Sequence, residues 1–522
     1  AVDRAEGAGE LLRWRDDLAD RADAAGAADP TAGEPPELDA DAVVRPDGFV
    51  LPDAAGFVIG RVIQTVAGPR GLNTLHAVTA SGSRVVSEVA TDGPAAGRLD
   101  LPGRSPLYVH PVPTAPTPAD ARNLAGGWSG NGRRAWRAGS ADPCPAEMLD
   151  RVRGRFIRYL ALPAADRDGL SRTLAAWTVA TYVASAFNAV PYLHLNGPAG
   201  SGKSRAADLL RRMAFRPLFT SSVTGPALFR TLHSRGGTLL LDEAERLGNP
   251  RDPAAAELLA MLLAGYKAGG RATRLEPVGE TFRPVGFEVF GFKALAGIAG
   301  LPAALASRCV RVGMIRADPD APEPRRNPED DPDGWAGLRD DLHALALAAG
   351  PSIRAAAADP PDAGLSNRDR ELWTPLLAVA AVCEAAGAAG EVAALAAYAA
   401  RSAADAGADA TPDADVMLLE CLHRLLLTGF DPPQPSDVLR AAREAEPGMF
   451  DRWTARGVGA RLKGYGLTIR KSHGRRVYRD LTPDDVAAAA ARYGVDLAGV
   501  DDPDPADAPP ADPWGDADGG PF

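Results

Sequence analysis

Residues 192–204 read YLHLNGPAGSGKS, an apolar run followed by a glycine-rich turn, and this stretch decides the fold class. The apolar run Tyr192–Asn196 predicts a strand, and RAADLLRRMAF after Ser204 predicts a helix. Between them, Gly-x4-Gly-Lys-Ser is the phosphate-binding loop pattern in its required context of strand, turn and helix. The alternative is a chance turn, because the chain has 55 glycines. Only five of the 57 basic residues are lysines, and this argues against a chance lysine at the one position that needs an amine.

The residue types of this loop suit a nucleotide. Backbone N–H groups of a glycine-rich turn can close around phosphates, and the start of a helix adds its dipole. Lys203 would reach the β and γ phosphates, and the Ser204 hydroxyl would hold Mg²⁺. The predicted ATP-binding loop consists of Gly197, Pro198, Ala199, Gly200, Ser201, Gly202, Lys203 and Ser204.

A second motif, GTLLLDEAE at residues 237–245, predicts a buried strand that ends in acids. Asp242 would bind the Mg²⁺ through water, and Glu243 would orient and deprotonate the attacking water. A strand that merely ends in acids at the surface is the alternative. The two motifs together predict an ATP-hydrolysing site with Mg²⁺.

Strands and helices alternate along the surrounding sequence. Five such units predict an α/β domain with a parallel sheet and helices on both faces. The predicted elements are strands at 192–196, 217–221, 237–242, 286–297 and 309–315, helices at 226–233 and 254–266, and a hairpin at 271–283 with its tip near 277–280.

The 522 residues suffice for about three or four domains. Four scattered cysteines without a CxxC pair predict reduced thiols and no zinc site. The sequence shows no signal peptide and no long apolar run, so we expect a cytoplasmic protein without a membrane span. The expected segments are an N-terminal helix and linker (1–41), a small β-rich domain (42–140), the ATPase core with preceding helices (146–330), a helical lid (331–410), a winged-helix domain (411–495) and a disordered acidic tail (496–522).

The motifs GPAGSGKS, LLLDEAE, LLAGYKAGG, ALAGIAGLPAALASRCVRV and NRDRELWTPLLAVA resemble a known group when taken in order. They are similar to the helicase branch of the AAA+ ATPases. Within it they look most like a family of ATPase domains from actinobacterial chromosomes, phages and integrative elements, which often sit beside primase modules. The resemblance covers about residues 150–493. It implies a parallel-sheet P-loop core with a helical lid, and assembly into a homo-oligomer, expected to be a hexamer.

Two arginine roles follow from the resemblance alone. Arg308, in LASR, would be the arginine finger that enters the ATP site of a neighbouring subunit. Arg368, with Arg370 as second choice, would be the lid arginine that senses ATP. This sequence departs from the AAA+ pattern at the end of the fourth strand, where a polar residue is usual and Ala296-Gly297 stands here. Lys293 is a candidate substitute, and the departure puts the hydrolysis rate in doubt.

The segment Arg452–Arg479 holds nine basic residues and no acid in a chain of net charge −11. Thr454 can cap a helix through Gly464, and strands at 467–470 and 477–479 would flank the basic turn KSHGRR. This order is typical of a winged helix on DNA or RNA. A solvated face, or one that docks on the chain's own acids, is the alternative. The candidate contacts are Arg456, Arg461, Lys463, Arg470, Lys471, Arg475 and Arg476.

Two further features could serve nucleic-acid transactions. Hairpin residues Arg271, Arg274 and Arg283 could line a pore or lie on the surface. The tail ends ADPWGDADGGPF and resembles the tip of bacterial single-stranded-DNA-binding proteins, whose terminal Pro-Phe docks on replication enzymes. An ordinary solubilising tail is the alternative.

The sequence therefore favours an ATP-driven DNA motor, a hexameric helicase-like ATPase for replication of a chromosome-borne or mobile element. The rival is a DNA-bound switch without strand separation, acting as a loader, regulator or defence protein. A small-molecule kinase is disfavoured because it would need neither the Asp242-Glu243 pair nor an intersubunit arginine. A primase or other replication protein is a possible partner through the β-rich domain or the tail.

Overall fold

The computed structural model describes residues 42–117, 127–221, 224–248, 252–278, 281–297, 300–365, 367–410, 413–428, 432–446, 449–451, 453–472, 475–493, 495 and 497. The expected N-terminal helix and linker, Arg452 and the acidic tail from residue 498 lie outside these ranges. The chain divides into two compact units, Ala1–Ala400 and Arg401–Phe522. Within the described ranges, every helix is too short or too polar to cross a membrane.

A five-stranded parallel sheet lies in the first unit. Its order β14-β8-β13-β10-β9 places β8, the strand before the glycine-rich loop, between β14 and β13. The prediction of a parallel sheet is confirmed. Its strands are β8 (Tyr192–Asn196), β9 (Pro217–Thr220), β10 (Thr238–Leu241), β13 (Lys293–Gly297) and β14 (Cys309–Gly313).

The strand predicted at 286–297 is wrong in its first half. Gly286 belongs to the hairpin of β11 (Arg271–Val278) and β12 (Thr281–Glu288), where it pairs with Thr273. The chain then bends at Gly291, whose φ of 148° lies in a region that side chains disfavour. The sheet strand begins only at Lys293. One apolar run therefore serves two different sheets.

Burial explains why these strands are continuous apolar runs. Every residue of β10 and β13 is buried, as expected for parallel strands covered on their faces. The helix α6 (Lys203–Met213) packs on β8, β9, β10 and β13 through buried Ala206, Leu209, Leu210 and Met213. The helix-forming run after the loop thereby anchors the loop to the sheet.

Further helices complete the first unit. α10 packs on α4 and α11, and α5 is buried along almost its whole length. Trp177 of α5 donates its indole N–H to the carbonyl of Pro191, directly before β8, at 2.9 Å. Apart from α3, given below, the other α-helices among the described residues of this unit are α4 (Pro145–Tyr159), α5 (Arg167–Ala180), α7 (Gly225–Arg235), α8 (Pro253–Ala264), α9 (Ala303–Ala306), α10 (Pro332–Ala358), α11 (Asn367–Ala385) and part of α12 (Glu391–Ala410).

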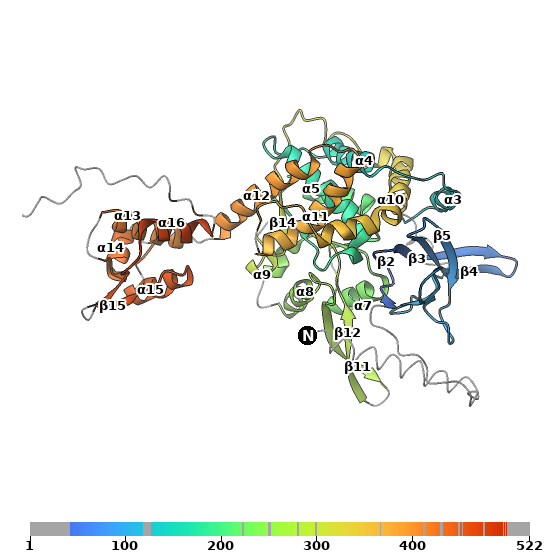
Figure 1. The fold of residues 1–522 in the computed structure, drawn as a ribbon, viewed down its shortest axis with the longest axis horizontal. Coiled ribbons are helices and arrows are strands. Elements are labelled where there is room, and N and C mark those ends of the chain that lie inside the picture. The colour runs from blue at the N-terminus through green and yellow to red at the C-terminus, as the bar shows by residue number, and fades with distance from the viewer. Residues whose placement is uncertain are drawn as a thin grey trace, which may run out of the picture. The chain divides into compact units, whose positions relative to one another are not determined.

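The β-rich segment, blue in Figure 1, belongs to the same compact unit as the parallel sheet. Arg216, which precedes β9, donates to the carbonyls of Val58 and Pro46, and Phe57 stacks on Phe215 with ring centroids 5.2 Å apart. Asp47 accepts a hydrogen bond from the N–H of Gly237, next to β10. Its elements are β1 (Val43–Val44), β2 (Phe49–Val50), β3 (Ala54–Thr65), β4 (Gly68–Thr79), β5 (Arg84–Val89), β6 (Arg98–Leu99), β7 (Leu107–Val109) and the following helix α3 (Gly130–Ala138).

The second unit has its own apolar core, which includes Leu422, Val458 and Tyr478. Thr454 caps α15 as predicted, because its side chain accepts from the N–H of Gly457. The two strands lie closer to the basic turn than predicted. The elements are α13 (Asp413–Leu427), α14 (Pro435–Ala445), α15 (Ala455–Gly464), β15 (Arg470–Ser472), β16 (Arg475–Val477) and α16 (Pro483–Ala491).

Candidate nucleotide site

The glycine-rich loop lies at the carboxyl end of β8, between the strand and α6. Gly200 and Gly202 adopt φ values of 78° and 91°, which favour glycine. Gly197 is required for space, because a Cβ there would lie 2.2 Å from the carbonyl oxygen of Met314. These three glycines allow the backbone to fold closely around a ligand, as a phosphate-binding loop requires.

Lys203 and Ser201 carry polar atoms that suit an anionic ligand. The Lys203 ammonium donates to the loop's own carbonyls, at 2.6 Å to Gly197 and 2.8 Å to Pro198. The Ser201 hydroxyl is buried and has no hydrogen-bond partner among the described residues. A bound phosphate would provide acceptors for both groups.

Two oxygens meet at the start of α6. The Ser204 hydroxyl lies 3.5 Å from a carboxylate oxygen of Asp242, which follows β10. Hydroxyl and carboxylate oxygens are the donors that Mg²⁺ prefers, and Mg²⁺ commonly keeps water between itself and a carboxylate. The residues present therefore fit a Mg²⁺ ion, which Ser204 and Asp242 would hold.

Glu243 is exposed and has an unusual backbone conformation, with φ at 59°. Its N–H donates to Asp242 at 3.0 Å, and its carboxylate lies 3.5 Å from the Arg246 guanidinium. Left-handed conformations in residues other than glycine tend to occur at functional sites. Glu243 is thus placed at the loop edge, with its carboxylate beside Arg246 in this conformation.

Arg316 was not singled out by any motif. It follows β14, and its Nε donates to the carbonyl of Ala199 in the loop at 2.9 Å. An isolated arginine in an irregular segment gives no sequence signal, since its position beside the loop depends on how β14 pairs with β8.

Lys293 cannot replace the polar group that is missing at the end of β13. It lies at the start of that strand, is 1% exposed, and donates to the carbonyls of Gly265, Val289 and Gly291. Burial, with a smaller contribution from Arg45, lowers the pKa of Lys293 well below its usual value. It stabilises the bend before β13, far from the loop.

Arg308 and Arg368 come together on the ring of Tyr266, at 5.7 and 5.1 Å from its centroid. The Tyr266 hydroxyl donates to Glu371 at 2.9 Å, and Glu371 also pairs with Lys267 at 2.8 Å. Both arginines are therefore held by groups of their own chain.

This arginine cluster lies at the opposite end of β8 from the loop. The carbonyl of Arg308 accepts from the N–H of Tyr192, the first residue of the strand. Five residues of strand separate Tyr192 from Gly197, or about 17 Å at ~3.3 Å per residue. Arg368, which contacts the same Tyr266 ring, accordingly lies at this end of the sheet and away from the loop of its own chain.

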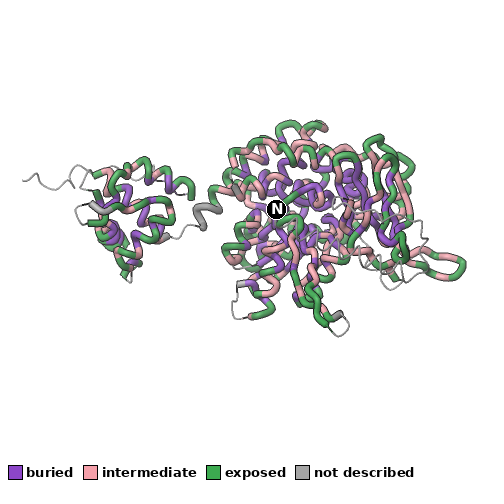
Figure 2. Tube along the Cα trace, turned by 60° about the horizontal axis from the view of Figure 1, so that its bottom comes forward, coloured by how far each residue is buried: buried purple, intermediate pink, exposed green. Residues whose placement is uncertain are grey.

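The hairpin arginines are largely engaged within the chain. Arg271 lies 3.6 Å from Glu288, and Arg274 lies 3.0 Å from Glu257 of α8. Arg283, across from Glu276, is exposed. Leu275 and Phe282, on the hairpin face that also carries Arg271, are 67% and 69% exposed. Figure 2 shows the hairpin projecting from the unit, with its outer part exposed.

In the second unit, one predicted nucleic-acid contact differs from the rest. Arg461 pairs with Asp415 at 2.7 Å, and Tyr465 donates to the same carboxylate at 2.6 Å. Asp415 is 1% exposed, so Arg461 holds α15 against α13. Arg470 pairs with exposed Asp480 at 3.3 Å. Lys471 lies in β15 opposite Arg476, and exposed basic side chains remain at Arg456, Lys463, Arg470, Arg475 and Arg476.

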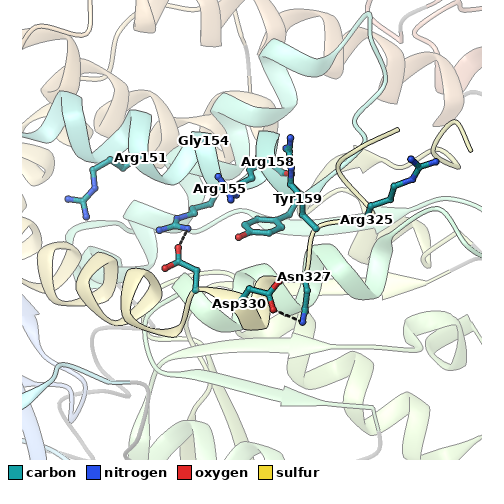
Figure 3. Close-up of a pocket in the computed structure, with 10 residues that line it drawn as sticks. Arg151, Gly154, Arg155, Arg158, Tyr159, Arg325, Asn327 and Asp330 are labelled. Atoms are coloured by element: carbon teal, nitrogen blue, oxygen red, sulfur yellow. Dashed lines mark hydrogen bonds and ion pairs between the residues drawn. The ribbon is translucent and has the colours of Figure 1, made fainter. Parts of the chain in front are cut away.

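A cleft of about 820 Å³ lies between α4 and the segment 325–331 (Figure 3). Arginines of both segments line it, a feature that the sequence analysis missed. Ion pairs to Asp341, Asp331 and Asp320 hold Arg151, Arg155 and Arg325. These carboxylates cancel much of the positive charge that an anionic ligand would meet.

Known proteins offer little guidance. Neither the profiles of known protein families nor the sequences of curated proteins match the chain. Among solved structures, SCCmec type IV Cch, described as an active helicase, is 10% identical over 69% of this chain and 79% of its own, with a TM-score of 0.31. The C-terminal region of NrS-1, in its A-form apo structure, is 12% identical over 78% of this chain and 93% of its own, with a TM-score of 0.32. JCV helicase with a bound small molecule is 15% identical over 49% of this chain and 72% of its own, with a TM-score of 0.20. Scores this low carry no argument about function.

Proposed function

We propose that the chain hydrolyses ATP and uses the energy to move on DNA, as a hexameric helicase-like motor in replication of a chromosome-borne or mobile element. One observation carries the proposal. The groups for binding a nucleotide meet at one end of the parallel sheet, while Arg308 and Arg368 meet at the other end. One chain therefore holds two half-sites that only a neighbouring copy can bring together.

The loop-side residues have distinct tasks in hydrolysis. Lys203 binds the β and γ phosphates after leaving its loop carbonyls, and Ser204 and Asp242 hold Mg²⁺. Mg²⁺, when bound, neutralises charge on the phosphate oxygens. Glu243 accepts a proton from the attacking water once its carboxylate has turned away from Arg246.

The arginine cluster completes the site from the next subunit. Arg308 would leave Tyr266 and stabilise charge on the γ-phosphate of the neighbour, and Arg368 would bind beside it. The resemblance described above supports a ring, expected to be a hexamer.

The second unit would supply DNA binding. Its exposed basic side chains on α15 and the β15–β16 hairpin suit phosphate contacts, which give salt-dependent binding with little sequence preference. We read this unit as a winged helix, with Arg461 assigned to the fold. A primase or other replication protein would dock on the β-rich segment or on the terminal Pro-Phe.

The alternative is a DNA-bound ATPase switch. The Glu243–Arg246 contact favours it, because a glutamate held away from the loop slows hydrolysis until another event releases it. Such a protein would change partners with its nucleotide state and would separate no strands.

Steady-state ATP hydrolysis with and without single-stranded DNA tests the proposal, with Lys203→Ala as the blank. Strong stimulation by DNA that the variant loses supports the motor, and a strand-displacement assay would follow. A slow rate that ignores DNA would contradict the motor and favour the switch.

A further inference from the structure

The end of β13 lacks a polar side chain but lies beside the loop. Its last residue, Gly297, pairs with Asn196, the residue directly before Gly197. A side chain on residue 297 would therefore emerge at the same edge of the sheet as the loop and Asp242. In the AAA+ ATPases that the sequence motifs resemble, a polar side chain at this position helps to position the attacking water.

Glu245 occupies the space that this side chain would need. A Cβ built on Gly297 would lie 3.0 Å from the Oε2 atom of Glu245 and 3.4 Å from its backbone nitrogen. Gly297 does not have a positive φ, so the backbone alone does not require glycine there. The glycine instead makes room for the carboxylate of Glu245.

That carboxylate has a buried atom without a partner. Oε2 of Glu245 is inaccessible to solvent and accepts no hydrogen bond from the described residues. The short helical turn at Ala244–Gly248 holds it in place, because Ala244 and Leu247 are buried on either side of it. A buried carboxylate oxygen without a donor requires an explanation, and a bound water or ligand that supplies the donor is one.

We propose that Glu245 is the positioning residue for the attacking water, in place of the polar residue missing from β13. In the reaction, the water oxygen bonds to the γ-phosphorus and the bond to the bridging oxygen of ADP breaks. One water proton passes to Glu243, and Glu245 accepts a hydrogen bond from the other O–H group. This inference rests on the proposed ATP hydrolysis and adds a residue to it.

A thermal-unfolding experiment, which requires no ATP hydrolysis, tests whether Glu245 occupies the space beside Gly297. Gly297→Ala places a methyl group against the Glu245 carboxylate and lowers the Tm of the full chain. The same substitution made in Glu245→Ala protein leaves the Tm nearly unchanged, because the carboxylate is gone. Equal losses of Tm in both backgrounds would show that Glu245 does not fill this space, and would overturn the inference.

The catalytic part is tested by moving the polar group back to β13. Glu245→Ala lowers kcat about 10- to 100-fold with little change in KM or in binding of a fluorescent ATP analogue. Glu245→Ala with Gly297→Asn recovers a measurable part of kcat, which a merely structural role would not produce. Glu245→Gln, which keeps shape and an acceptor oxygen, retains more activity than Glu245→Ala.

The outcomes separate the two proposals. Unchanged kcat in Glu245→Ala, or no recovery in the double variant while the fold and nucleotide binding persist, overturns the role of Glu245 but leaves the ATPase standing. No turnover by the unaltered protein, with or without DNA, removes the proposed function and this inference with it.

Discussion

The two ends of the parallel sheet differ in the kind of polar group that they hold buried without a hydrogen-bond partner. At the loop end, the Ser201 hydroxyl and a Glu245 carboxylate oxygen are buried without a hydrogen-bond partner. At the other end, Tyr266 and Glu371 engage Arg308, Arg368 and Lys267. Among the described residues, the buried atoms without a partner there are guanidinium nitrogens, Nε of Arg308 and Nη1 of Arg368. The loop end thus holds oxygens without a partner, and the arginine end holds guanidinium groups that residues of the same chain engage only in part. In the proposed function, these opposite kinds of group are the two halves of one site, which a neighbouring subunit would complete.

Mixing two inactive variants tests whether the two ends of the sheet act together in one site between subunits. Lys203→Ala and Arg308→Ala should each lower ATP turnover by at least about 100-fold, because one removes the phosphate contact and the other the charge from the neighbour. Mixed subunits should regain turnover, since a ring then contains intact loops facing intact arginines.

A mixture of Lys203→Ala with a variant that carries both substitutions serves as the control and should stay inactive. If the first mixture also stays inactive although both proteins co-assemble, Arg308 does not act between subunits.

Arg368 and Arg370 form a matched pair for the arginine end. Arg368 lies over Tyr266, whereas Arg370 is exposed. Arg368→Ala should reduce turnover about tenfold with binding of ATP to the isolated subunit unchanged, and Arg370→Ala should have little effect. Loss of ATP binding in the monomeric Arg368→Ala protein would instead place this residue at its own loop.

The second unit also contains two kinds of basic side chain, one that forms an ion pair within the unit and one that is exposed. Arg461→Ala leaves buried Asp415 without its main partner and should destabilise the unit by about 1–2 kcal/mol, discounted because Arg461 is half exposed. Lys463→Ala should leave thermal stability unchanged.

DNA binding separates the same two variants. Lys463→Ala should reduce the slope of log K against log salt by about 0.7–0.9, as for the loss of one phosphate contact. A folded Arg461→Ala protein should keep the slope of the unaltered chain. The reverse pattern would return Arg461 to the DNA surface.

The smallest expected effect concerns the pH dependence of the unfolding free energy. Measuring it separates a loss of activity caused by acid unfolding from a loss caused by damage to the site. Burial lowers the pKa of His343 to about 3, with smaller effects from nearby arginines. The unfolded state therefore binds more protons below about pH 6.5, and stability falls as pH drops from there toward 3. His343→Leu should make the unfolding free energy less dependent on pH in this window, as denaturant titrations would show. An unchanged slope would mean that other groups carry the acid sensitivity.

The loop and the strands around it were predictable from short stretches of sequence. A glycine turn, an amine and an apolar run act locally, so YLHLNGPAGSGKS indicates strand, loop and helix without knowledge of the rest. The capped helix after Thr454 was predictable for the same reason. The run 286–297 was misread because apolar character alone does not separate a hairpin strand from a sheet strand.

The sequence by itself determined the glycine-rich loop, the acidic strand end and the alternation that builds the parallel sheet, because each element depends on residues within a few positions of one another. Only the tertiary structure decided that Arg461 is held by Asp415, that Arg308 and Arg368 share Tyr266, and that Glu245 fills the space at Gly297. Those contacts join residues far apart in the chain, and their distances exist only once the sheet order has brought the segments together.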